Sequence, residues 1–173
     1  RIVLINNGSM SESLTLVNGD VYFRSLDGMR SYIQAVRDYA TPGNIPISRE
    51  MNRAFSKDDE SLLRYWSSIL FNNRLLSLTN GVSDRHGAIW KSIGVLDFDL
   101  VSTMRSQQPP AWEGVWTGYD FLSLFKGQFG GKDRAFFACR NPDKGFVSSI
   151  IVATDGVYGS FDPTTVTVED FDG

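Results

Sequence analysis

The chain has 173 residues, of which 42% are hydrophobic and 13% aromatic, enough for one packed domain with a sizeable core. Its net charge of −3 argues against a surface that grips phosphates, because such a surface needs clustered Lys and Arg. The only cysteine, Cys139, excludes an intrachain disulfide and a cysteine-based zinc site, and its apolar neighbours predict a buried side chain. No apolar run approaches the roughly 20 residues that span a bilayer.

The first part of the chain predicts a three-stranded antiparallel meander. Asn18–Gly19 is the dipeptide most typical of a tight hairpin, and Asp27–Gly28 predicts a second turn. Such a meander with short connections is the shape of a propeller blade or of a small barrel sheet. The strands of this meander are expected at 13–17, 21–25 and 29–32, and a separate short strand is expected before it, at 2–5.

A short helical insertion is expected at about 48–65, after two prolines and a glycine in 42–46 break the strand pattern. Ser48 and Ser56 can cap two successive helical turns. Asp59 then stands in the first turn of the second, where a carboxylate favours a helix N-terminus. We expect this insertion to pack on the sheet and to lead into the next hairpin.

The segment Ser67–Leu78 has the pattern of a core hairpin in an antiparallel sheet. Its apolar runs, 69–71 and 75–78, meet at Asn72–Asn73, and Asn tolerates the positive φ of a tight turn better than most residues. A loop is expected at 101–111. Further strands are expected at 89–100, 119–125, 134–140 and 146–152.

The last strands indicate sheets that are covered on both faces. With regular alternation, Tyr119, Phe121 and Phe125 lie on one face and Leu122 and Leu124 on the other. Stacked propeller blades carry this pattern, whereas a sheet with one wet face does not. We therefore predict an all-β fold of antiparallel meanders that form part of a β-propeller, with the short helical insertion.

The blade-like units are expected at about 1–35, 67–101 and 112–153. Three blades cannot close a ring of four to eight, so further chain or a neighbouring subunit must complete it. Since the chain also starts at Arg1 rather than at Met, we expect 1–173 to be one segment of a larger protein.

Residues that could carry acid, base or nucleophilic chemistry have simpler explanations. His86, the only histidine, shares one loop with Ser83 and Asp84, too crowded for a Ser-His-Asp triad, and a solvated loop position is favoured. Asp97 and Asp99, two apart on one strand face, could share a cation or divide acid and base roles. An outward polar face explains them equally well and is favoured.

The glycine-rich and aromatic stretches also favour structural roles. Asp155–Gly156 and Asp162 lack the spacing of a calcium loop, and Gly127–Gly131 lacks the Lys-Ser/Thr of a phosphate loop. An aromatic cluster could stack a sugar or a partner side chain, although packing beside Pro109–Pro110 is favoured. The sequence therefore assigns no catalytic residue, no cofactor-binding residue and no metal ligand. The aromatic cluster consists of Trp112, Trp116 and Tyr119.

Four parts of the chain resemble one family of phage proteins. Asp20–Tyr32, DVYFRSLDGMRSY, resembles a blade segment of phage tail proteins with the pattern V-Y-F-R-S-x-D-G-x-R-S. Ser48–Leu63 followed by Phe71–Leu76 resembles the stretch after it. The later blades of those proteins are similar to two further parts of this chain, Leu96–Ser102 and Trp112–Gly118 with Gly127–Phe137. The family is that of virion structural proteins related to the tail nozzle, or tail tubular protein, of short-tailed bacteriophages.

The resemblance implies a structural subunit of the phage tail and no enzymatic activity. Such a subunit contains a β-propeller, forms a homo-oligomeric ring and contacts neighbouring tail, adaptor or portal proteins of the virion. The genome passes through the resulting conduit without specific binding. The resemblance carries over no catalytic residue, cofactor or metal, and it also implies that the 173 residues are part of a longer chain.

The alternative is a carbohydrate-binding or sialidase-like propeller module. Ser25-Leu26-Asp27-Gly28 resembles the Asp-box turn of sialidases, although that box has a residue between Asp and Gly. An enzyme of this kind needs paired acids and clustered arginines that converge on the propeller axis. The available arginines are Arg24, Arg30, Arg53, Arg64 and Arg74.

Overall fold

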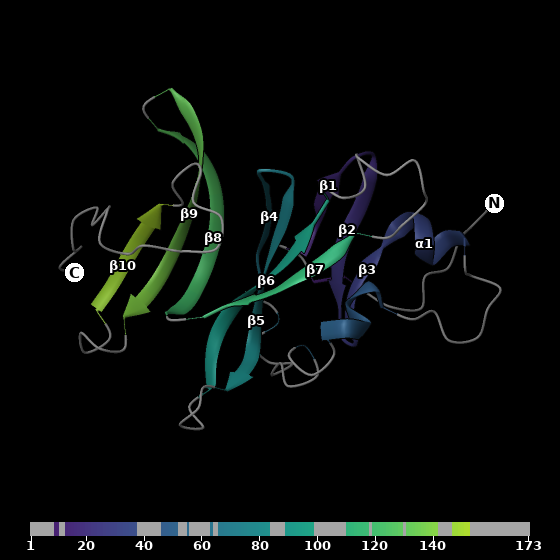
Figure 1. Cartoon of the computed structure of the whole chain (residues 1–173), viewed down its shortest axis with the longest axis horizontal. Coiled ribbons are helices and arrows are strands. Elements are labelled where there is room, and N and C mark those ends of the chain that lie inside the picture. Colours follow the sequence, from purple (N-terminus) through teal and green to yellow (C-terminus); the bar gives the residue numbers. More distant parts are fainter. Residues whose placement is uncertain are drawn as a thin grey trace.

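The chain folds mostly as antiparallel β-sheet in the part that the computed structural model describes. Within it lie one short α-helix, α1 (Tyr32–Arg37), and a 3₁₀ segment, η3 (Ile47–Met51). The strands form three sheets that stand side by side (Figure 1), so the all-β prediction is confirmed, while the described sheets do not close on themselves. The described residues are 9–10, 13–37, 46–51, 55, 63, 66–83, 89–98, 110–117, 119–129, 131–141 and 147–152.

The first sheet has the order β1-β2-β3 and contains the predicted meander. Asn18 and Gly19 have φ values of 51° and 82°, as the tight turn between β1 and β2 requires. Gly28 has φ 145°, and a Cβ there would lie 2.8 Å from Pro46 Cβ and would also clash with Ser48 Oγ, so only glycine fits. The strands are β1 (Thr15–Val17), β2 (Asp20–Ser25) and β3 (Gly28–Ser31).

Helix α1 follows β3 directly, where the sequence predicted that the strand would continue to residue 32. Ser31 caps the helix, since its Oγ accepts a hydrogen bond from the Gln34 amide at 3.1 Å. The Asp20 carboxylate accepts a second bond, from the Ile33 amide at 3.0 Å. Two of the unpaired amides of the first helical turn are thereby satisfied, and the strand ends there.

The second sheet has the order β4-β5-β6-β7. Asn72 and Asn73 have φ values of 47° and 57°, which confirms the predicted Asn-Asn turn between β4 and β5. Trp112 lies in β7 and was predicted to open the third unit, but β7 pairs with β6 and therefore belongs to the second sheet. The strands are β4 (Ser68–Phe71), β5 (Arg74–Ser83), β6 (Ile89–Asp97) and β7 (Ala111–Trp116).

The third sheet has the order β10-β9-β8, and its long first hairpin turns at Gly131, whose φ is 74°. Both strands of this hairpin extend further toward the turn than the sequence indicated. The strands are β8 (Asp120–Phe129), β9 (Lys132–Asn141) and β10 (Val147–Val152).

One face of the second sheet packs against the first sheet. Trp66 Nε1 donates to Ser77 Oγ at 3.0 Å, and Ser77 Oγ lies 3.6 Å from Met29 Sδ on β3. The rings of Tyr22 and Phe98 meet edge to face at 5.3 Å. Leu75, two residues from Ser77 and hence on the same face, is fully buried.

The opposite face of the second sheet packs against the third sheet. Trp116 on β7 meets Phe137 on β9 edge to face at 6.4 Å, and the Leu124 amide donates to Ser67 Oγ at 2.8 Å. Leu76, which faces this way, is 1% exposed. The second sheet is therefore covered on both faces, as Figure 1 shows from the positions of its neighbours.

A bulge in β8 overturns the predicted faces of the third sheet. Phe121 pairs with Cys139, but Ser123 pairs with Ala138, so Leu122 is an extra residue and the alternation reverses there. Phe121 and Leu124 consequently share the buried face with Phe137, whereas the sequence put them on opposite faces.

The expected strand 2–5 lies outside the described residues, as does most of the helical insertion at 48–65. Of that insertion the structure describes the end of η3, Phe55 and Leu63. Ser48, predicted as a helix cap, instead accepts a hydrogen bond from the Met29 amide at 3.0 Å and so ties η3 to β3.

We predict that Leu75→Ala and Leu76→Ala each lower the free energy of unfolding by about 2–5 kcal/mol, because each leaves a cavity on a covered face. Urea denaturation measures both. Leu26→Ala, at a side chain that is 60% exposed, is the matched control and should change stability by less than about 0.5 kcal/mol. A large loss in only one of the two core variants would contradict burial on both faces.

Candidate functional site

The turn that resembles an Asp-box is held by bonds among its own residues. Arg30 is 2% exposed, donates from Nε to Ser25 Oγ at 3.0 Å and forms an ion pair with Asp27. Ser25 Oγ also lies 2.6 Å from Asp27 Oδ1. These groups satisfy one another, which supports a structural role for the turn between β2 and β3.

This network also lowers the pKa of the Asp27 carboxyl group. Burial alone would raise its pKa, but hydrogen bonds from Arg30 and Ser25, together with the Arg30 charge, hold the pKa below its usual value of 3.8. The turn therefore favours the ionised carboxylate.

Arg24 is a buried cation that joins the first sheet to the segments beside it. Its guanidinium lies 5.2 Å from the ring centre of Phe55 and 5.0 Å from that of Trp66. It donates to the Phe55 carbonyl at 3.2 Å and to the Ser25 carbonyl. Since Arg24 is fully buried, its position fits a core role rather than substrate binding.

The arginines considered for a sialidase-like site point in different directions. Arg24 pairs with Met29 and faces the second sheet, whereas Arg30 pairs with Phe23 on the opposite face of the first sheet. Arg74 lies at the start of β5 in the second sheet. These three do not converge on one point; Arg53 and Arg64 lie outside the described residues.

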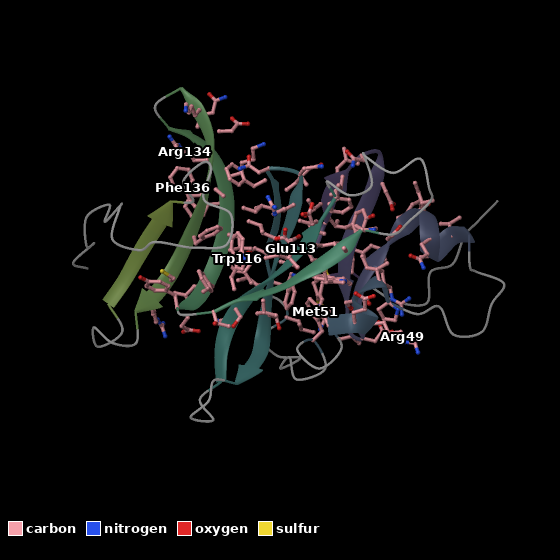
Figure 2. All side chains as sticks on the ribbon, in the orientation of Figure 1. Arg49, Met51, Glu113, Trp116, Arg134 and Phe136 are labelled. Atoms are coloured by element: carbon pink, nitrogen blue, oxygen red, sulfur yellow. The ribbon has the colours of Figure 1, made fainter. Side chains whose placement is uncertain are left out.

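Arg74 is the centre of an ion-pair cluster on the second sheet. Its Nε and Nη2 donate to the two carboxylate oxygens of Glu113 at 3.1 and 3.0 Å, and Nη2 lies 3.5 Å from Asp97 Oδ2. Figure 2 shows Glu113 on β7 in the middle of the molecule. The bidentate geometry holds the edge strand β7 to β5 across β6.

Asp97 was predicted to be solvated, and this is wrong. Its side chain is only 12% exposed, because the face of the second sheet that carries it is covered by the third sheet. The alternation of Leu96 and Asp97 is real, but it places the aspartate among buried neighbours with Arg74 as its counter-ion. Asp99 lies outside the described residues.

A second bulge separates the predicted aromatic cluster. Val95 pairs with Gly114 and Leu96 with Trp112, so Glu113 is the extra residue and Gly114 adopts φ 131°. Trp112 and Trp116 therefore lie on opposite faces of the second sheet. Trp112 donates to the Ile47 carbonyl at 3.0 Å and its ring meets Phe55 at 5.6 Å, while Tyr119 packs on Phe121 at 6.2 Å.

The remaining predicted site residues give no site in the described part of the chain. Gly127 lies in β8, where Phe136 packs over it, and hence in a hairpin strand. Cys139 is buried as predicted, and burial, with the Asp120 charge, raises its thiol pKa to about 11. Ser83 lies in β5 by its backbone. The residues that fall outside the described ranges are Asp84, His86, Asp155, Gly156 and Asp162.

The large apolar side chains that stay exposed in the described part all belong to the first or third sheet or to segments joined to them. On the first sheet they include Leu16, 67% exposed, and Ile33 on α1, 55% exposed. On the third sheet Phe125, 42% exposed, stacks on Phe136 with ring centres 5.2 Å apart. Exposed apolar surface of this kind is typical of protein or ligand contacts. The complete set is Leu14, Leu16, Leu26, Tyr32, Ile33 and Phe125.

No family model matches the chain, and no curated protein or solved structure is significantly similar to it. Among the described residues, no three His, Cys, Asp or Glu side chains are grouped so that they could hold a metal ion. The helices in the same residues are too short or too polar to cross a membrane. The exposed apolar side chains of the first and third sheets and of α1 are the candidate contact surface in the described residues.

We predict that Arg74→Met lowers the free energy of unfolding by about 3 kcal/mol, because it leaves the nearly buried Asp97 carboxylate without its counter-ion. Glu113→Gln should cost less than about 1 kcal/mol, since Glu113 is 35% exposed and solvent screens the pair. Chemical denaturation of both variants compares them. Equal losses would contradict the assignment of Asp97 as the buried partner.

We predict that Asp27→Asn weakens the acid sensitivity of folding. Because the pKa of Asp27 is lower in the folded than in the unfolded chain, its carboxylate stabilises the fold above pH 3.8 and loses this effect as the pH falls through the folded value. Unfolding free energies at about pH 3 and about pH 7 should differ less in the variant than in the parent. An unchanged pH difference would contradict the network.

Proposed function

We propose that the chain is part of a structural subunit of a bacteriophage tail, a nozzle or tube protein that lines the conduit for genome delivery. Asp20–Tyr32 carries this proposal, because its resemblance to phage tail proteins falls on residues with structural roles. Asp20 helps to cap α1, Arg24 is the buried cation, and Asp27 pairs with Arg30. Since these residues all stabilise the fold, the segment supports a structural protein rather than an enzyme.

The arrangement of the three sheets supports the propeller that this proposal includes. Each sheet is a meander, and the first strands lie near one another: β1 packs beside β4, and β4 beside β8. Thr15 and Ser68 join the first pair through hydroxyls 2.6 Å apart. Blades of a propeller stack face to face with their first strands toward a common axis in the same way.

The proposal includes a homo-oligomeric ring, contacts with adaptor or portal proteins, and a lumen that does not hold the genome. A net charge of −3 fits this role, because carboxylates repel phosphates weakly and allow DNA to slide. No catalysis is part of the proposal.

Labelling of phage particles with an antibody against this chain tests the location. We expect the label on the tail, and label anywhere else in the particle would overturn the proposal. In electrophoretic mobility shift, the protein should leave free duplex DNA unshifted at physiological salt. Tight, salt-sensitive binding by a monomer would contradict the conduit role.

Carbohydrate binding is the second candidate, and the exposed ring of Phe125 favours it. Aromatic rings that are open to solvent can stack on a sugar. Glycan-array binding that Phe125→Ala abolishes, with thermal unfolding unchanged, would support this alternative. Phe136→Ala removes the ring beneath and serves as the second variant. No binding by the parent protein would exclude it.

A further inference from the structure

We propose that η3 is a strap that opens as one unit while the three sheets stay folded, and that in its closed state it keeps the edge of β3 from pairing with other chains. This inference concerns one strand edge and does not depend on where the protein is found. The support comes from backbone hydrogen bonds, from close contacts at two glycines and from burial.

The strand β3 is an edge strand that the fold nevertheless buries. It is the last strand in the order β1-β2-β3, and all four of its residues are buried. The Arg24 amide donates to Ser13 Oγ on the far side of β2, so the pair of Arg24 with Met29 is of the kind that exchanges no hydrogen bonds. The Met29 amide therefore points away from β2, and an amide of this kind at an open edge invites another strand.

The strap closes this edge from one side. Ser48 Oγ accepts the hydrogen bond of the Met29 amide at 3.0 Å, and Ser48 is 2% exposed. The approach is close because Gly28 has no side chain: a Cβ there would lie 2.8 Å from Pro46 Cβ and would clash with Ser48 Oγ. A strand from another chain cannot reach the Met29 amide while η3 is in place.

The other end of the strap is fastened to the second sheet. Trp112 Nε1 on β7 donates to the Ile47 carbonyl at 3.0 Å, and the Trp112 ring lies over Gly94, where a Cβ would come within 3.3 Å of it. The segment accordingly packs on both β3 and β7. Figure 2 labels Arg49 and Met51 on it. The strap thus bridges two strands that belong to different sheets.

The strap is held more weakly than the sheets that it bridges. In the part of the chain that the structure describes, these two side-chain bonds are the hydrogen bonds that tie η3 to the sheets. Ile47 and Met51 are only partly buried against the core, and Arg49 and Glu50 are exposed. The backbone of Ser48, with φ −82° and ψ 15°, departs from helical values. A short segment with so few contacts opens at a lower free energy than strands buried on both faces.

The Leu124 amide provides an internal comparison. It points away from β9 and donates to Ser67 Oγ at 2.8 Å, as the Met29 amide does to Ser48. Leu124 lies between the second and third sheets, however, and both it and Ser67 are buried there. Exposure of the Leu124 amide requires these sheets to separate, whereas exposure of the Met29 amide requires only the strap to open.

Native-state hydrogen exchange of the 173-residue chain, followed by NMR at increasing urea, tests the opening. We expect the Met29 amide to exchange at least about 10-fold faster than the Leu124 amide and with little dependence on urea, because local opening exposes little surface. Exchange of both amides at the same rate and with the same urea dependence would overturn the proposal.

Two tryptophan variants on one strand test whether the strap opens as a unit. Trp112→Phe removes the bond to the Ile47 carbonyl and should accelerate exchange of the distant Met29 amide by about 2- to 10-fold. Trp116→Phe is the matched control, since Trp116 faces the third sheet and meets Phe137. It should leave exchange at Met29 unchanged. An unchanged Met29 amide in Trp112→Phe, or equal acceleration in both variants, would overturn the proposal.

Self-association of the same variants tests the protective role. If the closed strap blocks the edge of β3, the rate of aggregation should rise in step with the open population. We expect light scattering of Trp112→Phe to grow about 2- to 10-fold faster than that of the parent, by the factor seen in hydrogen exchange. Trp116→Phe should aggregate at the parent rate. Equal rates in the parent and in Trp112→Phe, or equal increases in both variants, would overturn the protective role.

Discussion

The structure depends on one constraint: the second sheet carries apolar side chains on both faces, so both faces must be covered. Leu75 and Leu76 are adjacent in β5 and both buried, which no sheet with a wet face allows. The first sheet and η3 cover one side, and the third sheet covers the other. Hydroxyl and amide bonds fix the spacing, from Thr15 to Ser68 on one side and from Leu124 to Ser67 on the other. Because the second sheet is apolar on both faces, it requires a neighbouring layer on each side, and this requirement explains the stacking of the three sheets.

The contacts of Arg24 explain why this charged residue stands in the otherwise apolar segment VYFRS. A buried guanidinium is costly unless its charge and most of its donors find partners. Here the rings of Phe55 and Trp66 flank it, and two carbonyls accept its hydrogen bonds. One side chain thus connects β2 with Phe55 and with Trp66, which lies just before β4. The arginine therefore stabilises the packing of the fold, and its place in this segment needs no catalytic explanation.

Local signals in the sequence predicted the turns well, whereas the two bulges were not predicted. Asn18–Gly19 and Asn72–Asn73 adopt the positive φ that their residue types favour. Glu113 and Leu122 are extra residues in β7 and β8, and each reverses the alternation that assigned side chains to faces. Bulges depend on tertiary packing; an isolated glycine in a strand, such as Gly114 beside Glu113, is a signal for one, whereas no such residue stands beside Leu122. Helix α1 did carry a signal: Ser31 followed three residues later by Gln34 has the spacing of a capping box. Asp97 was misjudged because its burial depends on the third sheet.

The bulge at Glu113 also bears on whether the second sheet can be extended through its edge strand β7. A regular edge strand offers a row of free amides and carbonyls that invites pairing with another chain. In β7 the extra residue breaks that row, and the Glu113 carboxylate turns inward to Arg74. Growth of the second sheet through this edge is thereby disfavoured.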